Sequence, residues 1–309
     1  MRDINSAEYS RNYGFWNEDE QKAIMSARVA IAGVGGDGYQ LGLKLAMMGV
    51  EIFDIADPEV FEPENSNRVP GATTLNYGRS KAEVFEESVK AINPDADIRI
   101  FKDGVNDDNI EDFTSRASII FDESELTYLH VGTSLARAAR QLGIPDVLVM
   151  NIGFSAQVTS FKPDSKMTFE KFMGIPEGAT TKDIKEMTVD FSRCLTYLPH
   201  YSDLRTLSAV KEGASLPSIA QGVDVASAVG SSQAFLHFTH NLGNNRPSPV
   251  WAPNVAYMDA YTLKGGATKY PRLSHFRHLG VAAFNNITGR NAKASYTSSD
   301  RSNRDKSIS

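Results

Sequence analysis

Short apolar runs alternate with amphipathic stretches through the first half of this chain. The run at 28–34 is rich in β-branched residues and leads directly into glycines, a pattern typical of a buried parallel strand that ends in a tight turn. Leu and Met then recur at helical spacing over 38–49, where Gly49 predicts the helix end. Further strands are predicted at 50–56, 97–101, 118–122 and 146–151, and further helices at 8–27, 79–92 and 127–142. Strands that alternate with helices predict an α/β fold, a Rossmann-like, doubly wound and mainly parallel sheet.

The second half of the chain has a less regular pattern and predicts an irregular C-terminal extension of that sheet. We expect a strand pair and a long crossover loop over 152–215, and a final strand or two within 250–263. Small and apolar residues fill 216–240 and predict a buried helix that closely approaches another backbone. We divide the chain into an N-terminal helical segment (1–27), a Rossmann-like domain (28–151), a crossover region that completes the same domain (152–290), and a disordered tail (291–309).

Composition narrows the class of protein. The 309 residues are 41% hydrophobic and 23% charged, as in globular domains, and the net charge is -6. We do not expect nucleic-acid binding, because no basic excess is present to neutralise phosphates. One cysteine, Cys194, rules out an internal disulfide and a Cys-based zinc site. No apolar run reaches the roughly 18 residues of a membrane span, so we expect a soluble, cytoplasmic protein.

The first candidate site is the glycine-rich segment Gly33–Gly38, which joins a predicted strand to a predicted helix. Glycines permit a tight turn and a close approach of the backbone to phosphate, and the helix N-terminus presents unpaired N–H groups to the anion. The glycines at positions 33, 35, 36 and 38 are therefore predicted to bind the cofactor (Gly33, Gly35, Gly36, Gly38).

Asp57 ends the second strand, about twenty residues after the glycine loop. A carboxylate at this place commonly accepts hydrogen bonds from ribose hydroxyls. Up to this point, the pattern fits an NAD-dependent oxidoreductase equally well.

Polar and basic residues after Asp57 separate the two hypotheses. Asn65, Asn67 and Arg68 follow the second strand, and Lys81 opens the next predicted helix. An arginine and a lysine that converge on the glycine loop would clamp a triphosphate, whereas a dinucleotide needs no such extra cations. The spacing therefore favours ATP over NAD.

In order and spacing, these motifs resemble the ThiF/MoeB/HesA family of ubiquitin-activating-enzyme-like adenylyltransferases. The resemblance covers residues 8–150, about half the chain, and is visible again at 216–240. It rests on Tyr9-Ser10-Arg11, Gly33–Gly38, Asp57, Asn65-Ser66-Asn67-Arg68, Gly78-Arg79-Ser80-Lys81 and Ile92-Asn93-Pro94.

The resemblance implies that a carboxylate is joined to AMP from ATP with release of pyrophosphate. It assigns Asp57 to the ribose, and Asn67, Arg68 and Lys81 to the ATP phosphates. It further implies that Arg11 reaches the phosphates of a partner subunit, so a homodimer is expected. The carboxylate is expected to be the C-terminus of a peptide or of a ubiquitin-like protein.

Two positions depart from the family pattern. Where the family has Asp-x-x-Asp-Asn with a Mg²⁺ ligand, this chain has Asp122, then Glu125 and Leu126. Glutamate is still a hard oxygen ligand that suits Mg²⁺, so Glu125 is the candidate ligand and Asp122 the fallback. The paired CxxC zinc motifs of many members are also absent. The altered metal position leaves a non-catalytic, nucleotide-binding partner subunit of the same family as an open alternative, and Cys194 as a nucleophile also stays open.

Overall fold

The structure is a computed structural model that describes residues 3–4, 6–125, 128–187, 195–201, 217–269 and 287. Leu126, Cys194 and the predicted tail at 291–309 lie outside the described residues. The first half of the chain forms β1 (Arg28–Ala32), α2 (Gly36–Met48), β2 (Ile52–Ala56), α3 (Lys81–Ile92), β3 (Asp97–Phe101), α4 (Ile110–Thr114), β4 (Ile119–Asp122), α5 (Leu129–Leu142) and β5 (Asp146–Ile152). The apolar pattern predicts each of these elements except α4.

The eight strands form one sheet in the order β3-β2-β1-β4-β5-β6-β7-β8. Pairing is parallel from β3 to β5, and the chain order reverses between β1 and β4, as in a doubly wound Rossmann-like sheet. The last three strands, β6 (Ser155–Phe161), β7 (Asn254–Asp259) and β8 (Lys264–Lys269), pair antiparallel and extend the same sheet. The predicted α/β fold is therefore confirmed.

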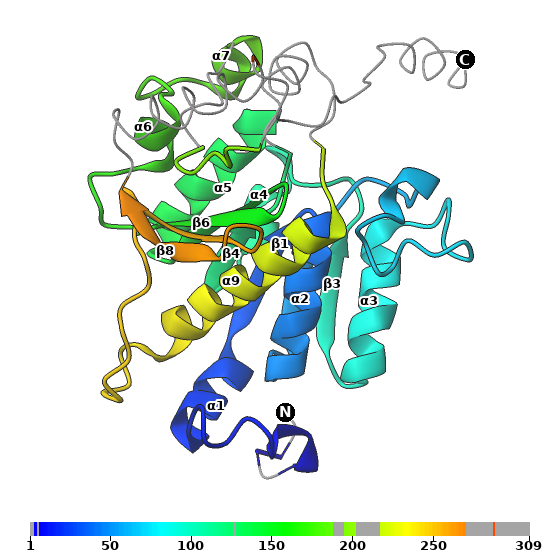
Figure 1. Cartoon of the computed structure of the whole chain (residues 1–309). Coiled ribbons are helices and arrows are strands. Elements are labelled where there is room, and N and C mark those ends of the chain that lie inside the picture. Colours follow the sequence, from blue (N-terminus) through cyan, green and yellow to red (C-terminus); the bar gives the residue numbers. More distant parts are fainter. Residues whose placement is uncertain are drawn as a thin grey trace.

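Helices cover both faces of the sheet. In β1, Val29 and Ile31 belong to the core under α2, α3 and α9 (Ala220–Thr239), whereas Ala30 and Ala32 face α4 and α5. Alternation along the strand thus explains why the whole run reads as apolar. Figure 1 shows α9 in yellow lying beside α2 in front of the sheet. On the other face, α6 (Phe169–Met173) and α7 (Thr181–Glu186) pack near α5.

The predicted helix at 8–27 is wrong in its first half. A 3₁₀ helix (Ala7–Tyr9) is followed by turns, and α1 covers only Glu18–Ser26. Asn17 starts α1 through a capping box with Glu20, and Gly14 just before it has a φ of 107°. The cap and the left-handed glycine break what the mixed pattern suggested was one helix.

The segment at 57–78, between β2 and α3, contains a second 3₁₀ helix (Pro63–Asn65). Within the described residues, no helix has both the length and the apolar content that crossing a membrane requires.

Candidate functional site

The glycine loop between β1 and α2 can be built only from glycine at two places. Gly33 has a φ of 104°, and a Cβ there would lie 2.4 Å from the backbone oxygen of Glu123. A Cβ on Gly38 would lie 2.0 Å from the backbone oxygen of Gly33. Gly35, which precedes α2, has no side chain to cap it, so the first-turn N–H groups are left for an anion. The loop therefore has the geometry of a phosphate-binding turn.

Asp57 ties this loop to the end of β2. Its carboxylate accepts hydrogen bonds from the Val34 amide at 2.8 Å and the Glu59 amide at 2.9 Å. Burial raises the pKa of Asp57, and the nearby charge of Lys81 lowers it again. The carboxylate thus holds the glycine loop in place, and its predicted contact with ribose stays a prediction.

The two predicted cations approach this loop from separate segments. Lys81, buried at the start of α3, forms an ion pair with Glu59. Arg68 lies beside the start of α2, since a Cβ on Gly36 would be 3.8 Å from its Cδ. Its guanidinium donates to the Glu64 carbonyl at 3.0 Å and to Asn67 Oδ1 at 2.9 Å.

The two predicted asparagines play local roles in this structure. Asn67 donates from Nδ2 to the Ser218 carbonyl at 3.0 Å, which fastens the loop to the segment that leads into α9. Asn65 is buried, and its Oδ1 accepts from the Glu62 amide at 3.0 Å within the 3₁₀ helix. Asn65 therefore shapes the turn that presents Arg68.

The sequence pattern did not reveal several polar residues at the loop. Asn151, at the end of β5, donates from Nδ2 to both carboxylate oxygens of Asp37, at 2.9 and 2.8 Å. Its Oδ1 accepts from Ser218 Oγ at 3.1 Å. Glu123 follows β4, and its Cβ and Cγ would lie 3.1 Å from a Cβ on Gly38. The only signal in the sequence was Asp37 itself, a carboxylate inside a phosphate-binding motif.

Burial raises the pKa of Asp37 and the pKa of Glu123. The pKa of Asp37 rises to about 7, mainly through loss of hydration, against the lowering effect of Asn151 and Arg68. Burial also raises the pKa of Glu123 well above its ordinary value, and the charges of Asp37 and Asp122 add to the effect. Two buried carboxyls with raised pKa values, Asp37 and Glu123, therefore lie beside the predicted phosphate site.

The two predicted metal ligands lie in different surroundings. Asp122 is buried and turned toward α5, because a Cβ on Gly132 would lie 2.5 Å from its Oδ2. Its Oδ1 accepts from Ser124 Oγ at 2.6 Å, and burial raises its pKa to about 6. Glu125 is exposed. Across the part of the chain that the structure describes, no group of three or more His, Cys, Asp or Glu side chains could hold a metal ion.

Arg11 lies far from the glycine loop of its own chain. The N-terminal segment packs against the C-terminal end of α2, where a Cβ on Gly49 would be 3.2 Å from Tyr9 Cε1. The 13 residues of α2 span about 20 Å, and Figure 1 shows the N-terminal segment below the helix, at the end away from the loop. Arg11 is exposed there, so within one chain it does not join the site.

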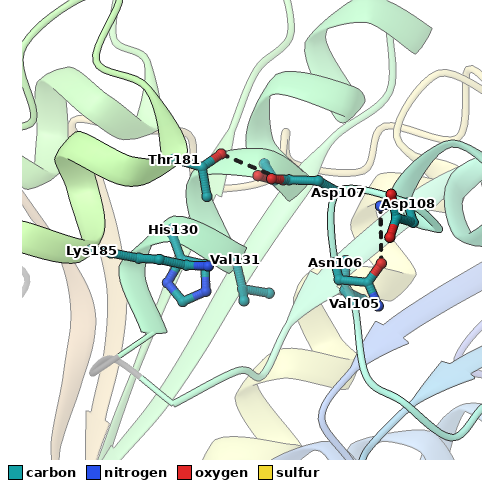
Figure 2. A pocket seen from close by; sticks show the side chains of 9 residues that line it. Val105, Asn106, Asp107, Asp108, His130, Val131, Thr181 and Lys185 are labelled. Atoms are coloured by element: carbon teal, nitrogen blue, oxygen red, sulfur yellow. Dashed lines mark hydrogen bonds between the residues drawn. The ribbon is translucent and has the colours of Figure 1, made fainter.

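A small polar hollow lies on the other side of the sheet, between the β3–α4 loop, α5 and α7. Figure 2 shows His130 and Lys185 facing Asp107 across it, and Thr181 Oγ1 donates to Asp107 Oδ1 at 3.4 Å. Burial and the charge of Lys185 lower the pKa of His130. The cavity measures about 240 Å³. Because small-molecule sites usually measure about 300–1,000 Å³, a whole nucleotide does not fit there.

Fold and site together define a Rossmann-like protein with a glycine-rich strand–turn–helix loop, a strand-end carboxylate and two cations near that loop. The family model described as "ThiF family" matches residues 9–278, and the chain belongs to this family.

Curated relatives match part of the chain. The SAMP-activating enzyme E1 of Haloferax volcanii is 28% identical over 166 residues, which cover 53% of this chain and 60% of that enzyme. The sulfur carrier protein ThiS adenylyltransferase of Escherichia coli is 25% identical over 145 residues, 47% of this chain and 57% of that protein. The matched region thus spans less than two thirds of either relative.

Solved structures of the same fold cover more of the chain. Escherichia coli MccB with ATP has a TM-score of 0.64 at 16% identity, covering 87% of this chain and 73% of MccB. PaaA has a TM-score of 0.62 at 15% identity, covering 88% of this chain and 77% of PaaA. At this identity, the similarity shows the shared fold alone.

Proposed function

We propose that this chain transfers AMP from ATP to a carboxylate and releases pyrophosphate. The observation that carries the proposal is the convergence of Arg68 and Lys81, from separate segments, on the glycine loop and Asp57. Curated relatives named as adenylyltransferases and activating enzymes support it. The C-terminus of a peptide or small protein is the proposed substrate, because MccB was solved with MccA and the Haloferax relative activates SAMP. A homodimer in the cytoplasm is part of the proposal.

The proposed reaction needs no general base. A carboxylate is already ionised near neutral pH, so its oxygen can attack the α-phosphorus directly. One O–P bond to the substrate forms as the bond to pyrophosphate breaks, and pyrophosphate carries away the electron pair. Catalysis then consists of positioning the reactants and neutralising phosphate charge. The α2 N–H groups, Arg68 and Lys81 would supply this, and a bound Mg²⁺ would neutralise further phosphate charge.

Lys81 is suited to this role because nucleotide binding can release it from its present partner. Glu59, the partner, is mostly exposed, whereas the lysine amine is nearly fully buried next to Asp57. A phosphate would offer the amine more negative charge and more acceptor oxygens at the same place.

ATP–pyrophosphate exchange tests the proposal. With a panel of peptide carboxylates, we expect Arg68→Ala and Lys81→Ala each to lower exchange by about two orders of magnitude or more, as loss of a charge-stabilising group at a reacting phosphate typically does. Lys90→Ala is the matched control, since Lys90 lies on the same helix but is exposed and pairs only with Glu86. Near-normal exchange in both site variants would overturn the assignment.

Two other functions remain to be separated from this one. A non-catalytic partner subunit of the same family is the alternative that the altered metal position leaves open, since Glu125 and Leu126 stand there. Such a subunit would bind ATP without exchange. An NAD-dependent oxidoreductase would leave Arg68 and Lys81 without a role. A thermal-shift measurement separates binding of ATP from binding of NAD⁺, because a ligand at about 100 times its Kd stabilises the folded protein by about 2.7 kcal/mol. A Tm rise with NAD⁺ and none with MgATP would exclude adenylylation.

A further inference from the structure

Two carboxylates from distant parts of the sequence meet at the glycine loop. Asp37 stands in the first turn of α2, and Glu123 follows β4 on the neighbouring strand. Glu123 lies against the loop, since its Cβ and Cγ would be 3.1 Å from a Cβ on Gly38. The charge of Asp37 acts on the Glu123 carboxyl.

Neither carboxylate is neutralised by a direct ion pair in the described structure. Glu123 Oε1 is buried and has no hydrogen-bond partner. Asp37 accepts its hydrogen bonds from the neutral amide of Asn151. Arg68 acts on Asp37 only through space, because its guanidinium donates to Glu64 and Asn67. A buried carboxylate oxygen without a partner is costly, so this arrangement requires a cation or a proton.

The same pair would repel the phosphates that the glycine loop is built to hold. Like charges a few ångströms apart in a partly dehydrated site oppose each other strongly. A divalent cation resolves both conflicts, because hard carboxylate oxygens bind it and phosphate oxygens complete its shell.

The other acidic residues near this edge are less suited to the cation. Asp122 Oδ1 accepts two hydrogen bonds from Ser124, and its Oδ2 is packed against Gly132 on α5. Glu125 is exposed on the loop beyond. Neither offers a buried carboxylate oxygen without a hydrogen-bond partner, whereas Glu123 does, and the Glu123 side chain lies against the glycine loop.

We infer that the divalent cation accompanying the nucleotide is held in this chain by Asp37 and Glu123, and that Asn151 orients Asp37 for this task. The inference rests on the proposed function for the identity of the nucleotide. It replaces Asp122 and Glu125, the ligands predicted from the sequence, with Asp37 and Glu123, which lie at the glycine loop.

Binding of Mn²⁺ alone to the nucleotide-free protein tests this, followed by the loss of the electron paramagnetic resonance signal of free Mn²⁺. We expect one site, and we expect Glu123→Gln and Asp37→Asn each to weaken it by about tenfold or more, since each removes an anionic ligand. Glu125→Gln should bind Mn²⁺ as the wild type does. Glu111→Gln, an exposed change on α4, is the matched control, and circular dichroism checks that each variant is folded.

The results separate this inference from the proposed function. Absence of a Mn²⁺ site in the wild type would overturn the inference, as would a loss in Glu125→Gln with none in Glu123→Gln. Those two measurements remain decisive if Asp37→Asn does not fold. Metal binding is read without nucleotide or turnover, so failed pyrophosphate exchange beside an intact Mn²⁺ site would reject only the adenylylation proposal.

Discussion

Asp146 is a buried carboxyl group at the start of β5. It opens β5 between Ile120 of β4 and Phe161 of β6, and it is only 1% exposed. Neither carboxylate oxygen has a hydrogen-bond partner among the described residues. Burial raises the pKa of Asp146 well above its ordinary value, and the charges of Asp122 and Glu170 add to the shift. The folded protein therefore binds this proton more tightly than the unfolded chain does.

The raised pKa makes stability depend on pH in a definite direction. The unfolded chain loses this proton near the ordinary pKa of about 4, while the folded chain keeps it to a much higher pH. Folded and unfolded states bind the proton equally below that ordinary value. As pH rises from there toward the raised pKa, the unfolded state gains an advantage, and the contribution of Asp146 becomes increasingly destabilising.

Asp146→Asn should therefore stabilise the protein at alkaline pH. We expect the free energy of unfolding near pH 8 to rise by roughly 1–3 kcal/mol, the usual cost of an unsatisfied buried polar group, and the gain to shrink toward about pH 5. Urea denaturation at both pH values measures it. Asp103→Asn, on the surface, should change stability by less than about 0.5 kcal/mol at either pH. An equal gain at both pH values would show that titration is not the cause.

Single residues of the site were partly foreseeable. The glycines, Asp57, Arg68 and Lys81 could be proposed from the sequence because they stand at recognisable offsets from predicted strands and helices. Asp37 and Glu123 could not be paired in this way, because 85 intervening residues separate them and only the β1–β4 pairing brings them together.

At the level of elements, α9 depends on small residues where it packs against the edge of the sheet. A Cβ on Gly222 would lie 2.2 Å from the Gly153 carbonyl oxygen in the β5–β6 turn. Asn151, just before that turn, connects through Ser218 to the start of the same helix. The small residues at 216–240 predicted this close approach, and the structure shows which backbone is approached.

Gly222→Ala should destabilise the protein, although alanine normally favours a helix by up to about 1 kcal/mol. The added methyl group would push α9 away from the turn, and overpacking of this kind costs typically about 1–3 kcal/mol. Ser232→Ala, on the exposed side of the same helix, is the control and should be neutral or slightly stabilising. A higher Tm for Gly222→Ala than for the wild type would contradict the contact.

Elements with a clear period were predictable, and those defined by tertiary pairing were less so. The parallel strands are buried on both faces, so their apolar runs stand out. The short helix α4 was missed because five residues hold too few apolar positions to set a period. β8 was not delimited because its residues, Lys264–Lys269, are polar or small and gain their strand geometry from β7.

For the whole molecule, the predicted site residues lie at the two opposite ends of α2. The glycine loop lies at one end, and the N-terminal segment that carries Arg11 packs at the other. A rigid helix of about 20 Å separates them, so Arg11 can serve a glycine loop only if that loop belongs to a second copy. The proposed role of Arg11 therefore requires the proposed homodimer.

Mixing two inactive variants tests this arrangement. Arg11→Ala and Lys81→Ala should each lack pyrophosphate exchange, but a mixed dimer would contain one site with both residues intact. Random pairing makes half of the dimers mixed, so co-refolded samples should recover about a quarter of wild-type activity. Arg68→Ala mixed with Lys81→Ala is the control and should recover nothing, because both residues would serve their own chain's site. Full activity of Arg11→Ala alone, or no recovery in the first mixture, would remove Arg11 from the site and leave the dimer without a catalytic reason.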